Sequence, residues 1–256
     1  MLKTAIKAAK EAGKIIVESM ENKKIIDYKS AVNILTDTDL KAEKNILSVI
    51  KQKFPDHSFY TEENLGKKTN SNHLWVIDPL DGTTNFFHSF PHFCVSIAHL
   101  CNGKVDLGVI FDPVKKELFY AEIGKGAFLN DKEIKVSNTE KLSDSLLITG
   151  FAYERGEILK RNLGYIEKFF DAGIQGIRRT GSAALDLCYI ACGRADGYWE
   201  FALKSWDHAA ASLIITEAGG EITKINGEKY EVFKNDIIAS NSKIHEQMLE
   251  VLRSIK

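Results

Sequence analysis

Apolar residues recur every three to four positions at the start of the chain, and this spacing predicts two amphipathic helices. The first is predicted over residues 2–21, where one face carries Leu2, Ala5, Ile6, Ala9, Ala12, Ile16, Val17 and Met20. The second is predicted over residues 39–53, capped by Thr36 or Thr38 and followed by Pro55, where a helix cannot easily continue. Two helices therefore precede the first predicted strand.

Short runs rich in β-branched and aromatic residues follow and predict strands. They cover residues 59–61, 74–77, 93–100, 105–111, 117–122 and 146–149, with an Asn-Gly hairpin turn at 102–103. In the second half, strands around 175–179, 197–202, 221–225 and 236–239 alternate with helices near 157–171, 182–192, 207–218 and 242–254. This order predicts an α/β fold with sheets layered between helices.

No linker divides the chain, which has only four prolines in 256 residues and no Ser/Gly-rich tract. A chain of this length can form one large unit or two small domains that share a cleft. We therefore expect two intimately packed halves, residues 1–145 and 146–256, that act as one catalytic unit.

The charge of the chain is almost balanced, with 34 basic and 35 acidic residues and a net charge of −1. Because there is no excess of positive charge to attract a phosphate backbone, nucleic acid is an unlikely partner. No run of 18 apolar residues and no export signal is found, so we expect a cytoplasmic protein without a membrane partner. The four cysteines form no CxxC motif and are expected to be unpaired.

Candidate chemistry begins where the strand predicted over residues 74–77 ends. Asp78 and Asp81 follow it in a turn that Pro79 stiffens and in which Gly82 allows close approach. Two neighbouring carboxylates repel each other, and a hard divalent cation with oxygen ligands removes that repulsion. An isolated Asp-x-x-Asp is usually an ordinary turn, so this interpretation depends on further ligands.

Two other segments supply such ligands. Glu62 ends the strand predicted over residues 59–61, and Glu63 beside it fits a solvated neighbour. Asp207 begins a helix of small residues, where on its own it would fit an N-cap. Together with Asp78 and Asp81, these carboxylates predict a cation site.

The motifs TDTD at residues 36–39, EE at 62–63, DPLDGTTNF at 78–86, WDHAA at 206–210 and EAGG at 217–220 occur in one order along the chain. In this respect the whole chain resembles the inositol monophosphatase family, part of the lithium-sensitive, magnesium-dependent phosphomonoesterases that include fructose-1,6-bisphosphatase. The resemblance implies a layered α-β-α-β-α sandwich of the sugar phosphatase type. It also implies two or three Mg2+ ions, inhibition by lithium and a homodimer.

The resemblance implies a role for each of these acidic groups. Glu62, Asp78 and the Leu80 carbonyl would bind one magnesium ion, while Asp78, Asp81 and Asp207 would bind a second. A bridging carboxylate of this kind holds two ions about 3.5–4 Å apart, one to activate water and one to stabilise the leaving alkoxide. The metal-binding loop would then belong to the N-terminal half, and the last aspartate to the C-terminal half.

Catalytic and substrate-binding residues follow from the same resemblance. Glu62, Thr83 and Asp39 would be catalytic, with Thr83 orienting the attacking water and Asp39 accepting its hydroxyl hydrogen bond and relaying the proton. We expect direct in-line attack without a phosphoenzyme. The substrate contacts implied are Asp81, Gly82, Thr83, Thr84, Gly181, Ser182, Ala183 and Glu200. For Glu200 the alternative is an edge-strand charge in water, and the roles of Arg178, Arg179 and Lys204 stay open.

The favoured function is the hydrolysis of myo-inositol 1-phosphate, a small phosphate monoester. The alternative within this fold is a fructose-1,6-bisphosphatase or a phosphatase with both activities. A phosphatase that uses Asp78 as nucleophile is a further class, but it would carry an Asp-x-Asp motif near the start of the chain. The alternative of another kind is a partner of the transcription machinery or of RNA.

His88, His92 and His99 lie within twelve residues of one another and raise the question of zinc. No cysteine or further histidine stands at a recognised spacing, and His99 is expected to alternate out of a strand. We therefore predict that these three histidines do not form a zinc site.

Overall fold

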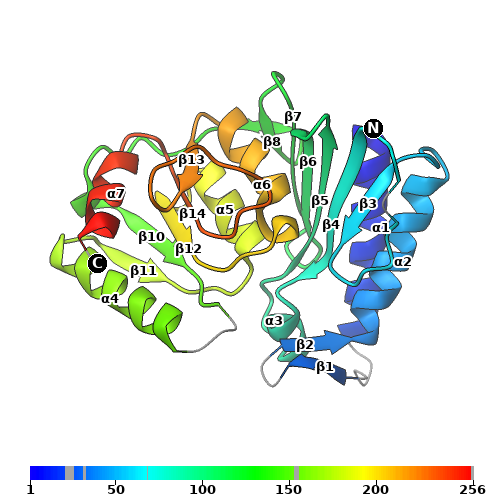
Figure 1. The fold of residues 1–256 in the computed structure, drawn as a ribbon, viewed down its shortest axis with the longest axis horizontal. Helices are drawn as coiled ribbons and strands as arrows, with labels where there is room; N and C mark the ends of the chain where they lie inside the picture. The colour runs from blue at the N-terminus through cyan, green and yellow to red at the C-terminus, as the bar shows by residue number, and fades with distance from the viewer. Residues whose placement is uncertain (21–25, 31–32, 68, 153–155, 255–256) are drawn as a thin grey trace.

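The computed structural model describes residues 1–20, 26–30, 33–67, 69–152 and 156–254 in five layers, α-β-α-β-α (Figure 1). One outer layer holds α1 (Leu2–Met20) and α2 (Asp37–Lys51), which cover a seven-stranded sheet. The middle layer holds α5 (Ala183–Ala191) and α6 (Ser205–Glu217). A five-stranded sheet follows, and α4 (Glu157–Asp171) and α7 (His245–Arg253) cover its far face. The predicted fold class is confirmed.

The seven-stranded sheet is a meander in which strand order follows chain order. Its strands are β3 (Ser58–Thr61), β4 (His73–Asp81), β5 (Cys94–Cys101), β6 (Lys104–Asp112), β7 (Glu117–Glu122), β8 (Ala127–Leu129) and β9 (Lys132–Ile134). Only β3 and β4 run parallel, so their carboxyl ends meet at one edge of the sheet. The Asn102-Gly103 turn between β5 and β6 has φ of 50° and 77°, values that suit this residue pair.

The five-stranded sheet has the order β11-β10-β12-β14-β13 and mixes parallel and antiparallel pairs. Its strands are β10 (Leu146–Thr149), β11 (Gly176–Arg178), β12 (Gly197–Glu200), β13 (Glu221–Lys224) and β14 (Ile237–Ser240). The two sheets divide the chain between β9 and β10, where the boundary of the two halves is expected. That the halves act as one unit stays a prediction.

Alternation along β4 connects three layers. Trp75 and Ile77 pack toward α1 and α2, and Val76 between them packs toward α5 and α6. Helix α6 lies very close to β6, because a Cβ on Gly108 would be 2.4 Å from the Ala210 carbonyl oxygen. Glycine at this position therefore sets how deeply α6 sits on the sheet.

Several elements were not expected from the sequence. These are the antiparallel pair β1 (Ile26–Ser30) and β2 (Asn33–Thr36), the short helix α3 (Thr83–Phe87), strands β8 and β9, and a 3₁₀ turn at Leu142–Asp144. Helix α1 ends at Met20 among the described residues, and predicted position 21 lies outside them. Helix α2 begins at Asp37 with Thr36 as its cap, one of the two predicted caps. Within the described part of the chain, no helix is both long enough and apolar enough for a bilayer.

Candidate functional site

Three carboxylates meet where β4 ends beside the start of α6. Asp78 and Asp81 lie on β4 and Asp207 lies in the first turn of α6, and one oxygen of each is within 4.8 Å of the others. Asp78 and Asp81 are only 2% and 9% exposed. The sequence-predicted cluster therefore exists as a group of close carboxylates from two distant segments.

The backbone that carries Asp78 and Asp81 differs from the expected turn. Strand β4 continues to Asp81, with Asp78 opposite Ser96 and Asp81 opposite Cys94, and the register shifts between the two pairs. Residues three apart on a regular strand would point to opposite faces of the sheet. The irregularity turns both carboxylates to one side, and the chain then leaves the strand at Gly82, whose φ is +92°.

Glu62 reaches this cluster from β3. Its backbone N–H donates to the Ile77 carbonyl oxygen at 3.2 Å, which continues the parallel pairing of β3 with β4. Burial and the neighbouring carboxyl groups, Glu62 first, raise the pKa of Asp78 well above its usual value. The side chains of Glu62 and Asp78 therefore interact, and the role of Glu62 as a ligand stays a prediction.

Glu43 on α2 holds the segment after β3 and was missed by the sequence analysis. Its fully buried carboxylate accepts hydrogen bonds from the Thr61 hydroxyl at 2.6 Å and from the backbone N–H groups of Glu63 at 2.9 Å and Leu65 at 2.8 Å. The sequence feature that could have identified Glu43 is its position next to Ala42 on the apolar face of α2, where a charged residue is unusual. Glu43 thereby fixes the backbone on both sides of Glu62.

Asp207 is the third residue of α6. It is not the N-cap of this helix, which was the alternative considered for it from the sequence. Its Oδ2 accepts from the backbone N–H of Lys204, the exposed residue that precedes the helix, at 2.7 Å. The Ser96 hydroxyl donates to the Trp206 carbonyl at 3.1 Å and so ties the helix start to β5. Burial, followed by the charge of Asp81, raises the pKa of Asp207 well above its usual value.

The chemistry of this donor set fits a hard divalent cation. Burial and neighbouring carboxyl groups also raise the pKa of Asp81 to about 6, although hydrogen bonds from Ser182 and Ala184 oppose the rise. Carboxyl groups that disfavour one another's charged forms are stabilised as carboxylates by a bound cation. Oxygen donors of this kind suit Mg2+.

Thr83 and Asp39 form the expected pair beside the acidic cluster. The Thr83 hydroxyl lies 3.1 Å from Asp39 Oδ1 and 3.0 Å from the Leu80 carbonyl oxygen, and can donate to either. Asp39 Oδ2 accepts from the backbone N–H of Thr36 at 2.9 Å and from its hydroxyl at 2.5 Å. Burial raises the pKa of Asp39 to about 6. Asp39 is thus oriented by the cap of α2.

The start of α5 contacts Asp81 directly. The Ser182 hydroxyl donates to Asp81 Oδ2 at 2.6 Å, and the backbone N–H of Ala184 donates to the same oxygen at 2.8 Å. Ser182, with Gly181 and Ala183, was expected to contact the substrate, and that contact stays a prediction. In this structure the Ser182 side chain orients a carboxylate of the acidic cluster.

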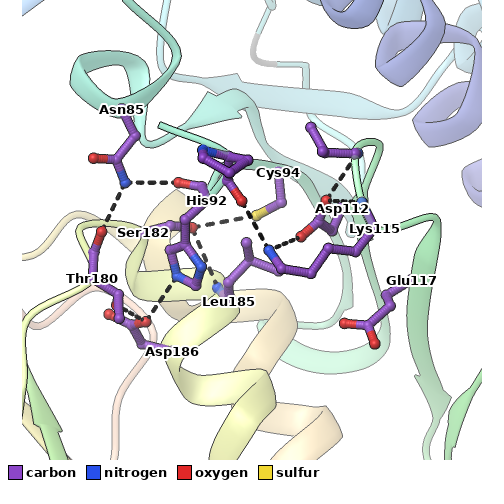
Figure 2. Close-up of polar contacts among 12 residues, drawn as sticks. Asn85, His92, Cys94, Asp112, Lys115, Glu117, Thr180, Ser182, Leu185 and Asp186 are labelled. Atoms are coloured by element: carbon purple, nitrogen blue, oxygen red, sulfur yellow. Dashed lines mark hydrogen bonds and ion pairs between the residues drawn. The ribbon is translucent and has the colours of Figure 1, made fainter. Parts of the chain in front are cut away.

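A set of hydrogen bonds joins the two halves of the chain next to these residues, and Figure 2 shows it. The Asn85 side-chain NH₂ donates to the His92 carbonyl oxygen at 2.7 Å and to the Thr180 carbonyl oxygen at 2.8 Å. His92 Nε2 lies 3.1 Å from Asp186 Oδ1. No motif indicates the His92–Asp186 pair, whose members are 94 residues apart.

Glu200 is not an edge-strand charge in water, because β12 is the central strand of its sheet and the side chain is only 9% exposed. The Tyr198 hydroxyl donates to its Oε2, and burial raises the pKa of Glu200 to about 8. Arg179 is exposed, yet its guanidinium is near enough to oppose this rise. A Cβ on Gly181 would lie 2.8 Å from Arg179 Nη1, so Gly181 leaves room for that arginine.

The structure corrects the prediction for His99. This residue is fully buried and lies beside His57 and His73, instead of alternating out of β5. His92 pairs with Asp186, and His88 is exposed at the end of α3. Among the described residues, His88, His92 and His99 do not form a group whose ring nitrogens could share one metal ion.

The five-layer fold and its carboxylate cluster define a metal-dependent phosphatase. The sequence profile of the inositol monophosphatase family matches residues 1–256, and the chain belongs to this family. Members of the family are magnesium-dependent phosphoric monoester hydrolases.

The sequences of individual relatives align with this chain over almost its whole length. Inositol monophosphatase 1 of Homo sapiens is 39% identical over 246 residues, which span 94% of this chain and 89% of the human protein. A Nus factor SuhB of Pseudomonas aeruginosa is 40% identical over 260 residues, spanning 99% of this chain and 96% of that protein.

Solved structures share the fold. Inositol monophosphatase from Anabaena matches with a TM-score of 0.90 at 39% identity, over 100% of this chain and 96% of that one. An IMPase/NADP phosphatase complexed with Mg2+ and phosphate matches with a TM-score of 0.83 at 26% identity, over 94% and 90% of the two chains.

Proposed function

We propose that this phosphatase hydrolyses small phosphate monoesters, with myo-inositol 1-phosphate as preferred substrate. The observation that carries the proposal is the convergence of Asp78, Asp81 and Asp207 within 4.8 Å beside the Thr83–Asp39 pair. The relatives named inositol monophosphatase, at 39% identity for the human protein, support the choice of substrate.

In this proposal Mg2+ is held by Glu62, Asp78, the Leu80 carbonyl, Asp81 and Asp207. When bound, it supplies positive charge that acidifies the attacking water and stabilises the developing alkoxide. The number of ions, two or three, is part of the proposal. A relative of the same fold that is complexed with Mg2+ and phosphate supports the choice of metal.

The attacking water would be oriented by Thr83. Its hydroxyl donates to Asp39, so the oxygen lone pairs can accept a hydrogen bond from water and fix the direction of attack. Asp39, with a pKa raised to about 6 by burial, can take up the proton that this water loses. The bond from water to phosphorus then forms in line as the bond to the alcohol oxygen breaks.

The two parts of the substrate would be bound by different segments. Backbone N–H groups of Gly82, Thr83 and Thr84, with Asp81 acting through its bound metal, would hold the phosphate. The alcohol would contact the 181–183 segment and Glu200. Because its pKa is raised to about 8, Glu200 is protonated at neutral pH and can both donate to and accept from a ring hydroxyl.

A phosphate-release screen tests this function. Inositol, sugar and nucleotide phosphates are compared at one magnesium concentration, with Asp207→Asn as the matched inactive variant. We expect magnesium-dependent turnover of myo-inositol 1-phosphate and a loss of about 100-fold or more in the variant. Activity confined to fructose 1,6-bisphosphate would refute the substrate, and equal activity in the variant would refute the site.

Fructose 1,6-bisphosphate is the second candidate substrate, since Arg179 is exposed near Gly181 and suits a second phosphate. We do not propose a role as a partner of RNA or of the transcription machinery. The net charge of −1 gives it no support, although relatives named Nus factor SuhB occur.

A further inference from the structure

Three histidines gather at the end of the seven-stranded sheet that lies opposite the acidic cluster. His57 directly precedes β3, His73 begins β4 and His99 lies on β5 opposite Trp75. One ring nitrogen of each lies within 4.8 Å of the others. His73 and Asp78 are five residues apart on one strand, which places the histidines about 16 Å from the carboxylates.

The nearest pair of nitrogens already has the spacing of two metal ligands. His73 Nδ1 lies 3.2 Å from His99 Nε2. Two nitrogens bound to one tetrahedral zinc at about 2.0–2.1 Å are about 3.3 Å apart. A metal ion could therefore replace this hydrogen bond if each ring turns so that its lone pair points off the line between the two nitrogens and toward the ion.

An acidic neighbour fixes the chemical form of His99. Its Nδ1 lies 2.5 Å from Asp106 Oδ1, so the ring proton sits on Nδ1 and the lone pair of Nε2 faces His73. A histidine that donates its other ring nitrogen to a carboxylate is the usual arrangement around a protein-bound metal. Burial also lowers the pKa of His99 and of His57, which favours the neutral form that binds a metal.

His57 is the third candidate ligand, and to bind the ion it would have to give up one hydrogen bond. Its ring is stacked on His73 with centroids 4.5 Å apart, and its Nδ1 accepts from Trp75 Nε1 at 3.0 Å. To present a lone pair to the same ion, His57 has to release Trp75 or turn its ring. His57 and His73 are partly exposed, which gives an ion and a water molecule access to the site.

We propose that His57, His73 and His99 form a second metal site, separate from the magnesium site, that binds a transition-metal ion such as Zn2+. Imidazole nitrogens prefer Zn2+, Cu2+ or Ni2+ to Mg2+, so the two sites differ in the metals they select. The bound ion connects β3, β4 and β5 at one end of the sheet, and its role is structural.

Metal titration tests the proposal directly. Metal-free protein is saturated with Mg2+ and titrated with Zn2+ by calorimetry, and Co2+ is followed by its visible absorption. We expect wild type to bind one zinc that Asp207→Asn retains, and Co2+ to give the intense bands of a tetrahedral site. His73→Gln should weaken this binding about tenfold or more, and Asp106→Asn by about 10- to 100-fold. The matched control is His88→Gln, which removes an exposed histidine outside the cluster and should bind zinc as wild type does.

Two outcomes would overturn the proposal. One is zinc uptake that His73→Gln leaves unchanged and Asp207→Asn abolishes, because the zinc would then occupy the carboxylates. The other is the absence of nitrogen coupling when Cu2+ binds to the wild-type protein, a measurement that does not depend on how the variants fold. Bound Cu2+ that shows no nitrogen coupling in its paramagnetic resonance spectrum cannot be held by these histidines.

Discussion

The proposed orientation of the attacking water depends on the pair of Thr83 and Asp39. Both side chains are buried, and Asp39 is also held by the backbone and the side chain of Thr36. Two acceptors for the Thr83 hydroxyl, Asp39 and the Leu80 carbonyl, are therefore in place before any substrate arrives, and in our proposal this preorganisation lowers the barrier to attack.

Replacing Thr83 with valine keeps the shape and removes the hydroxyl. We expect kcat for phosphate release to fall about 100-fold while the magnesium dependence changes little, because the carboxylates remain. Steady-state kinetics over a magnesium series measures both. The matched control is Thr38→Val in the same region, since the Thr38 hydroxyl is buried without a hydrogen-bond partner among the described residues. A wild-type kcat in Thr83→Val would exclude Thr83 from water orientation.

Glu200 predicts a pH dependence of stability. Its pKa rises from 4.5 to about 8 on folding, so between these values the folded state holds a proton that the unfolded state has released. Stability contributed by this group is present below about pH 4.5 and is lost as the pH rises through about 8, by at most about 5 kcal/mol.

The substitution Glu200→Gln should remove that part of the pH dependence. Urea unfolding at pH 5 and pH 8, with magnesium constant, measures the difference for wild type and variant. We expect the variant to lose less stability than wild type between the two pH values. Equal losses would mean that Glu200 ionises normally in the folded protein.

Among the elements, α6 has the most direct influence on the site, because it carries Asp207 on a helix that lies against β6. A Cβ on Gly108 would clash with the Ala210 carbonyl at 2.4 Å, so Gly108→Ala has to push the helix away. We expect a loss of about 1–3 kcal/mol in stability and a reduced affinity for magnesium. Thermal unfolding and magnesium titration measure the two effects.

The comparison variant is Gly176→Ala on β11, where an added methyl meets the end of the Arg178 side chain at 3.3 Å and Leu146 Cδ1 at an ordinary 3.9 Å. It should unfold near the wild-type temperature and bind magnesium normally. If Gly108→Ala behaved in the same way, the close contact between β6 and α6 would not control the site.

At the scale of elements, the sequence predicted the helices and turns that local residue patterns determine. Apolar spacing located α1, and the Asn102-Gly103 pair located the hairpin of β5 and β6. The register shift between Asp78 and Asp81 was missed, because it depends on pairing with β5 and not on local residue types. The burial of Glu200 on the central strand of the five-stranded sheet could likewise not be inferred from a single segment.

Across the whole molecule, contacts between distant segments decide which residues meet. The expected metal ligands Glu62, Asp78, Asp81 and Asp207 were all named from their motifs, although their role as ligands stays a prediction, whereas the supporting Glu43 was missed. His57 and His99 are 42 positions apart, and with His73 they follow no motif spacing, so only the strand pairing of β3, β4 and β5 brings the three together. Asp186 on α5 and His92 before β5 likewise meet only because distant segments pack against each other.

The two halves share one hydrophobic cluster, in which Val76 and Ala98 pack with residues of α5, α6 and the second sheet. We therefore expect a single cooperative unfolding transition, with coincident curves from fluorescence and circular dichroism. Two separated transitions would show that residues 1–145 and 146–256 fold independently.

Assembly as a homodimer and location in the cytoplasm also stay predictions. Light scattering measures the first, since a dimer has twice the 28.7 kDa mass of the chain. A molar mass equal to one chain at micromolar concentration would contradict it.

The central claim is that carboxylates from β3, β4 and α6 hold the catalytic metal. A crystal grown with Mn2+ in place of Mg2+, with diffraction recorded at the manganese absorption edge, tests it most directly. We predict anomalous peaks within coordination distance of Asp78, Asp81 and Asp207, with Glu62 at one of them. A map with no peak among these residues, and Asp207 turned away from Asp78, would contradict it.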